Sequence, residues 1–167
     1  VEENIPVALS EDEKTKVELY YSEKSSRYTF TQLQNTYLNN SLRFADTKAG
    51  ALVAVNGLII KFVADYLPNW QGVEYWLGVA SIVLFVVSIC ISLIVVYPRN
   101  INKKGKGFIY WGYIAKDTLE NYQNQIQNGP VSELLEESIR NNYQQAIVLD
   151  KKFHQLNLAF KVSYLSY

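Results

Sequence analysis

The chain has 167 residues, of which 49% are hydrophobic and 19% are charged, and its 16 basic residues balance 16 acidic ones. This composition suits one or two modest units that are partly embedded in a membrane, and we expect no nucleic acid polymer among the partners. The single cysteine, Cys90, excludes an intramolecular disulfide and a multi-cysteine metal site.

Residues 1–10 lack both a basic start and an apolar stretch, so we expect an unstructured lead without a cleavable signal peptide. A charged segment that is predicted to be helical follows at 11–25. From Thr29 a helical pattern begins, with Ser26 or Thr29 as the candidate N-cap, and no Gly or Pro interrupts it before Gly50. We predict one long helix that runs from the cytoplasm into a first membrane span, with its 28–48 portion projecting about 30 Å below the bilayer.

Two apolar stretches predict a transmembrane hairpin. Residues 75–97 contain no charged side chain, and their length suffices for a helix across a hydrocarbon core of about 30 Å. A helix is favoured over a strand because only a helix satisfies its own backbone in lipid. The earlier stretch is interrupted by Asn56, Lys61 and Asp65, and its two charged residues lie near the far end, where they can snorkel. Turn residues at 68–72 join the predicted spans, which are 49–67 and 73–97.

Basic residues on both flanks predict the orientation. Arg43 and Lys48 precede the first span, and the second span is followed by Arg99, Lys103, Lys104 and Lys106. The positive-inside rule then predicts a multi-pass membrane protein whose N-terminus and basic flanks are cytoplasmic. The basic stretch at 99–106 is better explained by this topology signal than by binding to anionic lipid.

The segment after the hairpin changes in character. An aromatic cluster at 108–114 is expected at the interface or under the hairpin, a polar helix is predicted at 117–127, and Ser132 is the candidate cap of a last helix. An apolar stripe along this helix predicts a partner helix, the best candidate being the extension of the first span, in parallel or antiparallel orientation. The stripe comprises Leu135, Ile139, Tyr143, Ala146, Ile147, Leu149, Phe153, Leu156 and Phe160. Polarity drops from Leu156, which leaves open a third span.

These patterns predict an all-α membrane protein, a transmembrane helical hairpin with long cytoplasmic helical extensions that form a helical bundle. The predicted division is a lead and charged helix at 1–25, a long helix plus hairpin at 26–107, and a cytoplasmic helical segment at 108–167. We expect no enzymatic activity, catalytic residue, metal or cofactor, because His154 stands alone and the chain lacks a zinc cluster, a nucleophile elbow and a glycine-rich phosphate loop.

The densest charge lies where the long helix meets the bilayer, in the sequence RFADTKAG at 43–50. Asp46 is three residues from Arg43 and four from Gly50, so a carboxylate adjoins a small residue on one helix face. One interpretation is that Arg43 and Lys48 are topology anchors and Asp46 neutralises one of them. The other is a polar node that joins helices or contacts a nucleotide.

This junction resembles the membrane effector domain of bacterial Pycsar antiphage systems. The resemblance covers roughly residues 35–165 and follows the order of several elements: ADTKA at 45–49, LVAVNGL at 52–58, Tyr97-Pro98-Arg99, residues 108–115, and a long helix through Lys151 and Lys152. Trp111, Gly112 and Tyr113 depart from the family pattern, because a more acidic Gly-Asp type element is expected there.

The resemblance implies an effector that responds to a cyclic pyrimidine nucleotide, made on infection, by impairing the bacterial inner membrane. Its regulatory ligand would be cyclic CMP or cyclic UMP. Two helices cannot enclose a pore, so this activity requires a homo-oligomer. Gly50, Ala54 and Gly57 offer a close-packing face, used either between copies or within one hairpin.

A cyclic nucleotide needs a cationic partner for its phosphate and an aromatic face for its base. The candidate ligand or helix-junction residues are Arg43, Asp46, Lys48, Arg99, Tyr110 and Trp111, with Lys151 and Lys152 as further cations. The alternative function is a membrane-anchored helical scaffold or interaction module without pore activity. A constitutive ion channel is less favoured, because the second span has no polar stripe to line a pore.

Overall fold

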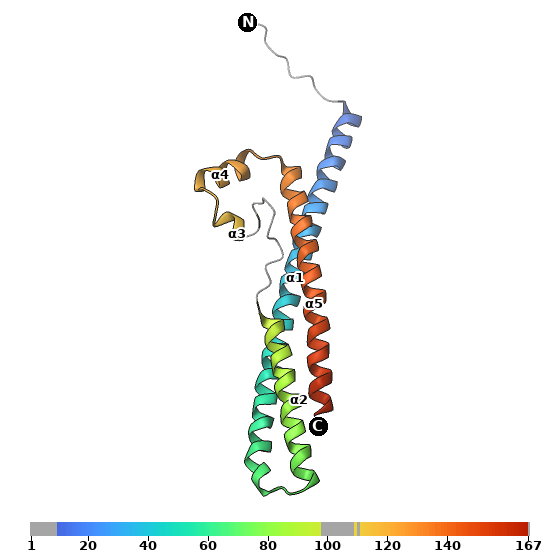
Figure 1. The fold of residues 1–167 in the computed structure, drawn as a ribbon. Helices are drawn as coiled ribbons and strands as arrows, with labels where there is room; N and C mark the ends of the chain where they lie inside the picture. Colours follow the sequence, from blue (N-terminus) through green and yellow to red (C-terminus); the bar gives the residue numbers. More distant parts are fainter. Residues whose placement is uncertain (1–9, 98–108, 110, 167) are drawn as a thin grey trace.

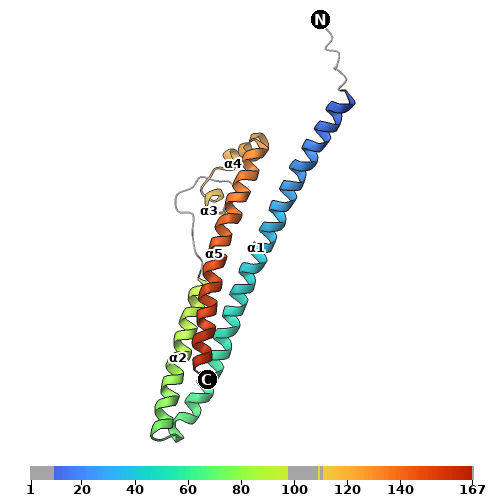
Figure 2. The same ribbon diagram turned by 90° about the vertical axis from the view of Figure 1, so that its right-hand side faces the viewer.

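A computed structural model describes residues 10–97, 109 and 111–166, and within them every regular element is a helix. The predicted all-α fold is therefore confirmed. In chain order the elements are α1 (Glu11–Tyr66), the 3-10 turn η1 (Leu67–Asn69), α2 (Val73–Val96), α3 (Trp111–Ile114), α4 (Leu119–Asn128) and α5 (Val131–Leu165). The three long helices α1, α2 and α5 lie side by side, and the short α3 and α4 lie beside the upper part of α5 (Figures 1 and 2).

Helix α1 joins two helical segments that the sequence predicted separately, one at 11–25 and one from Thr29. Ser10 and Glu13 form a capping box, in which the Ser10 Oγ accepts from the Glu13 backbone N–H and the Glu13 carboxylate accepts from the Ser10 N–H. The predicted caps Ser26 and Thr29 lie inside the helix, where their hydroxyls donate to the carbonyls four residues back. Neither Ser26 nor Thr29 is therefore a cap, and α1 continues without a break across 25–26.

A tight turn joins α1 and α2 where the sequence predicted it. Gly72 adopts a φ of 60°, in the left-handed region that only glycine enters without strain. Gly78 on α2 lies so close to the turn that an added Cβ would come 2.6 Å from the Trp70 ring and 2.7 Å from Leu67 Cδ1. Both hairpin helices are long and apolar enough to cross a membrane. The bounds of the spans within the bilayer stay a prediction.

The last helix packs on the extension of the first span, as predicted, and its direction is now defined. Cross-helix hydrogen bonds join α1 to α5, and the residue numbers of their partners rise together: Thr31 and Asn35 with Asn142, Asp46 with Lys152, and Asn56 with Ser163. Helices α1 and α5 are therefore parallel. Helix α2 runs antiparallel to both and fills the groove beside their lower halves (Figure 1).

The buried face of α5 differs from the predicted apolar stripe. Ile139 and Tyr143 are 52% and 68% exposed, and Phe153 and Phe160 are also exposed. The buried residues Asn142, Lys152, Leu156, Ala159 and Ser163 instead follow alternating steps of three and four residues, with Leu149 half-buried at the same spacing. Small or hydrogen-bonding side chains on this face let the helices approach closely. The prediction is therefore right for Leu156, which is buried, and wrong for Ile139, Tyr143, Phe153 and Phe160.

Helices α4 and α5 meet at the predicted break. Thr118 caps α4 by accepting from the Asn121 backbone N–H, and α4 ends at Asn128 before Gly129 and Pro130. Pro130 is the N-cap of α5, without a side-chain hydrogen bond, and its fixed φ suits a helix start. Ser132 lies inside the first turn, so its predicted role as the cap is wrong.

Candidate functional site

The centre of the three-helix bundle holds a buried polar network. The Asn56 Nδ2 of α1 donates to the Ser88 Oγ of α2 over 2.9 Å, and the Ser163 Oγ of α5 donates to the Asn56 Oδ1 over 2.8 Å. The Ser88 Oγ in turn donates to the Ala159 carbonyl over 2.8 Å. Asn56 and Ser88 have no exposed surface. Each helix is thus hydrogen-bonded to both of the others at one level.

This network explains why polar residues interrupt the apolar helices. Water is absent at membrane depth, so a buried amide or hydroxyl must find a protein partner. Interhelical hydrogen bonds in membranes contribute about 0.6 kcal/mol on average and up to about 1.7 kcal/mol. Apolar packing alone would tolerate sliding, whereas the bonds between Asn56, Ser88 and Ser163 fix the register of α1, α2 and α5.

An ion pair joins α1 to α5 about three helical turns above this network. The Lys152 ammonium donates to the Asp46 carboxylate, and the lysine side chain is 8% exposed while the aspartate side chain is 38% exposed. The sequence identified Asp46 as a polar node and named Lys152 among the cations, but it placed Arg43 beside Asp46. The sequence feature that could have identified Lys152 is its spacing: it lies four residues before Leu156 in the pattern of three- and four-residue steps that marks the buried face of α5.

The other candidate residues near the junction are not brought into this pair. Arg43 and Lys48 are exposed, and the Lys48 ammonium lies 4.3 Å from the centroid of the Phe44 ring. Within the part of the chain that the structure describes, Arg43 forms no ion pair. Arg99, Tyr110 and the side chain of Trp111 lie outside the described residues, so their predicted roles stay predictions.

Just below the ion pair the three helices come into apolar contact. Ala49, Val95 and Leu156, one from each helix, form a buried cluster. The end of α5 is linked to α2 by the Ser81 Oγ, which donates to the Ser166 carbonyl over 2.6 Å. Helix α5 therefore ends beside α2, and the hairpin extends beyond it to the turn (Figures 1 and 2).

The small residues of α1 do not pack within the hairpin. Gly50, Ala54 and Gly57 are all exposed, and a Cβ added to Gly50 or Gly57 would meet nothing within 4 Å. Of the two roles that the sequence left open, packing inside the hairpin is therefore wrong. The face stays available to a neighbouring helix.

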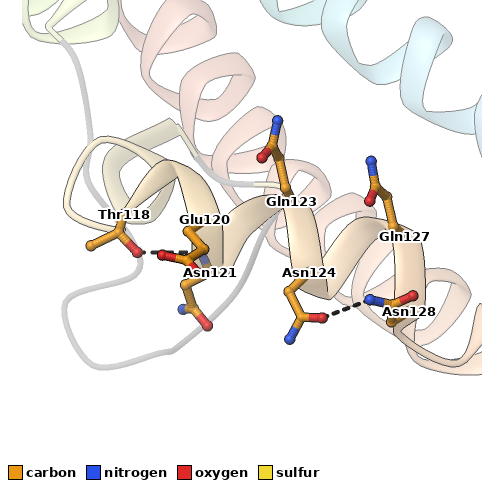
Figure 3. A pocket seen from close by; sticks show the side chains of 7 residues that line it. All are labelled: Thr118, Glu120, Asn121, Gln123, Asn124, Gln127 and Asn128. Atoms are coloured by element: carbon orange, nitrogen blue, oxygen red, sulfur yellow. Dashed lines mark hydrogen bonds between the residues drawn. The ribbon is translucent and has the colours of Figure 1, made fainter.

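A shallow hollow of about 490 Å³ lies along α4, away from the junction (Figure 3). Its lining is Thr118, Glu120, Asn121, Gln123, Asn124, Gln127 and Asn128. These side chains offer amide donors and acceptors, but the lining includes no cation to meet a phosphate. The hollow therefore lacks the chemistry that the predicted ligand requires.

Taken together, these features define a class of protein. Polar contacts lie between the helices, many large apolar side chains are exposed, and two helices are long and apolar enough to cross a bilayer, so the chain is an all-α membrane protein.

Within that class the chain belongs to the family of the Pycsar effector protein domain, whose model matches residues 31–167. The chain is similar to the Pycsar effector protein SaPycTM of Staphylococcus aureus. The two are 29% identical over 139 residues, which cover 83% of this chain and 88% of the relative. No solved structure matches the chain.

The family membership confirms the resemblance seen in the sequence. The family is one of antiphage effectors, and the chain is a membrane-associated member of it. Its members are non-enzymatic effectors, whereas the absence of activity in this chain stays a prediction.

Proposed function

We propose that the chain is the membrane effector of a bacterial antiphage signalling system, which senses cyclic CMP or cyclic UMP, assembles into a homo-oligomer and impairs the inner membrane. The observation that carries the proposal is the partly buried Asp46–Lys152 pair in a chain of this family. The pair joins α1 to α5 immediately above the apolar cluster where all three helices meet. A ligand that changes the pair acts directly on the packing of the membrane helices.

The phosphate of a cyclic nucleotide carries the charge that would compete with Asp46 for Lys152. Because Asp46 is 38% exposed, an anion can approach the pair from its side. Arg43 lies one turn from Asp46 on α1, where its guanidinium is available for a charge-assisted hydrogen bond to phosphate. Release of the Asp46 carboxylate would remove a contact between α1 and α5.

A second polar group on α5 supports a ligand at this level. The Gln145 Oε1 is buried and has no hydrogen-bond partner within the described residues. A buried acceptor without a donor costs about 1–3 kcal/mol, so an incoming donor is favoured. Gln145 lies two turns above Lys152, about 10 Å along the helix, and cytosine and uracil both carry N–H donors on their base edges.

The charge distribution supports an orientation that exposes this junction to the ligand. Positive flanks on both sides of the hairpin favour a junction on the cytoplasmic side of the inner membrane, where a cyclase product would accumulate. The exposed face of Gly50, Ala54 and Gly57 supports association between copies, because small residues allow close helix approach in lipid.

Binding and leakage measurements test the proposal. Purified protein in detergent is titrated with cyclic CMP and cyclic UMP, and Arg43→Ala and Gln145→Leu are expected to weaken binding. Arg140→Ala is the matched control, because its exposed pair with Glu136 lies within α5 and away from the junction. In liposomes, the parent protein is expected to release a trapped dye when a cyclic pyrimidine nucleotide is added. Binding that Arg43→Ala and Gln145→Leu leave unchanged would overturn the proposed site.

A scaffold without pore activity is the second candidate. It is favoured by the N-terminal part of α1, where residues 11–23 are exposed along with their aromatic side chains and the helix stands apart from α5 (Figure 2). Such a surface suits a protein partner. Liposomes that stay sealed under every cyclic nucleotide would favour the scaffold over the effector.

A further inference from the structure

Lys161 of α5 lies level with the middle of the uncharged run on α2. The Ala159 carbonyl accepts from Ser88, and the Ser166 carbonyl accepts from Ser81, so seven residues of α5 match seven of the antiparallel α2. By this register Lys161 lies at the same height in the bundle as Val86. Val86 is eleven residues from each end of the run at 75–97, which places Lys161 about 16 Å from either end.

The ammonium of Lys161 has no counter-charge within the chain as described. Lys161 is exposed on the outside of the bundle and forms no ion pair or hydrogen bond with another described residue. A lysine side chain reaches about 6 Å, too short to bring its ammonium from this level to a headgroup. Lys61, the other lysine at span depth, differs because its ammonium lies 3.5 Å from Asp65 on the same helix.

Lys161 belongs to a polar stripe that runs along the outer face of α5. Its members are exposed and recur at steps of three and four residues, on the side of the helix opposite the buried seam: Asp150, His154, Asn157, Lys161 and Tyr164. Exposed apolar residues flank the stripe, with Phe153 and Phe160 on one side and Leu158 and Leu165 on the other. Lipid can solvate the apolar flanking residues, whereas the polar residues of the stripe need water or a polar partner.

We propose that copies of this chain assemble with the α5 stripes facing one another around a water-filled, anion-conducting path. The inference rests on the proposed function and specifies which helix lines the opening. Intramembrane charges face a bundle interior or an aqueous cavity, and other copies of the chain would supply such a cavity for Lys161. The flanking apolar residues then contact the adjacent copies. A ring of lysines at mid-depth selects anions.

The sequence had discounted a channel because α2 carries no polar stripe. In the structure Ser88 and Ser92 of α2 are buried, with Ser88 bonded into the seam and Ser92 donating to the Ser88 carbonyl. The stripe that faces outward lies on α5 instead, in the segment whose entry into the membrane the sequence left open.

Ion selectivity tests the assignment. The protein is reconstituted in planar bilayers under a potassium chloride gradient, and the reversal potential is measured after addition of cyclic CMP or cyclic UMP. The parent is expected to prefer chloride, Lys161→Gln to lose much of that preference, and Lys161→Glu to reverse its sign. Lys61→Gln is the matched control, because it also removes a lysine at span depth, and it is expected to keep the chloride preference.

Water accessibility provides a second readout that does not depend on selectivity. In a Cys90→Ser background, Asn157→Cys and Lys161→Cys are expected to react with a charged thiol reagent in the presence of nucleotide, whereas Phe160→Cys is protected. Suppose that nucleotide induces a conductance, that Lys161→Glu leaves its selectivity unchanged, and that Asn157→Cys and Lys161→Cys do not react. This result would overturn the assignment of the α5 stripe to the path and would leave the proposed function intact. The absence of any nucleotide-induced conductance would overturn the proposed function with it.

Discussion

The Asp46–Lys152 pair predicts an asymmetric response to removal of its two partners. Asp46→Asn leaves the Lys152 ammonium, which is 8% exposed, without a counter-charge, whereas Lys152→Met leaves a carboxylate that is 38% exposed and can be hydrated. Removal of one partner from a fully buried pair costs about 3–5 kcal/mol. Because water already reaches Asp46, we reduce the expected cost of Asp46→Asn to about 2–3 kcal/mol.

Lys152→Met and the double variant are expected to lose less stability than Asp46→Asn. Lys152→Met is expected to cost about 1 kcal/mol or less, since the remaining carboxylate is partly in water. The double variant is expected to regain most of the stability lost in Asp46→Asn, because it removes the uncompensated charge as well as the pair. Coupling between the two positions should therefore be large and favourable.

Equilibrium unfolding in mixed micelles, followed by helical circular dichroism, measures these free energies of unfolding. The control is Arg140→Gln, which breaks an exposed pair within α5 and is expected to change stability by about 0.5 kcal/mol or less. The reasoning is refuted if Lys152→Met destabilises the bundle more than Asp46→Asn, or if the two effects simply add.

Three further predictions concern the bundle, the turn and the start of α1. Asn56→Leu removes two interhelical hydrogen bonds at similar side-chain volume and is expected to lower the free energy of unfolding by about 1–3 kcal/mol in the same titration. A variant as stable as the parent would contradict a stabilising role for the network of Asn56, Ser88 and Ser163. Gly78→Ala places a Cβ 2.6 Å from the Trp70 ring and is expected to lower the free energy of unfolding by about 1–3 kcal/mol. The control Gly57→Ala has open space around its Cβ and is expected to cause no measurable loss. Equal effects of the two variants would contradict the packing of the turn. Two hydrogen bonds from Ser10, the stronger one from its backbone N–H and the other from its side chain, lower the pKa of Glu13 below its ordinary value of 4.5. The cap is therefore complete above pH 4.5 and is lost as the pH falls through the lowered pKa of Glu13. An NMR pH titration of the Glu13 and Lys14 amides checks this, since Glu13→Gln should remove the acid transition and its persistence would refute the cap.

The sequence predicted the hairpin well because the responsible signals are local. The uncharged run at 75–97 and the turn residues around Gly72 specify two helices and their connection without reference to the rest of the chain. The long helix before them follows from an uninterrupted pattern. Its N-cap was misplaced because Ser10, Ser26 and Thr29 have similar capping side chains, and Ser10 is distinguished by the acidic first turn that follows it, which includes Glu13 of the capping box.

The packing of α5 was harder to predict because the usual rule for soluble helices is inverted here. An apolar stripe normally marks the buried face, and by that rule Ile139 and Phe160 point inward. In this bundle Asn142, Lys152 and Ser163 occupy the interior, where each forms a hydrogen bond to α1. The partner of Asp46 lies 106 residues away in the sequence, beyond the range of any local pattern.

The membrane potential of living bacteria tests the central claim most directly. Cells that produce this chain are loaded with a potential-sensitive dye, and a pyrimidine cyclase is induced to supply cyclic CMP or cyclic UMP. The proposed effector predicts rapid depolarisation only when both proteins are present, and Asp46→Asn should change the nucleotide level at which it occurs. A membrane that stays polarised at saturating cyclic CMP and cyclic UMP, with the protein verified in the membrane, would contradict the account.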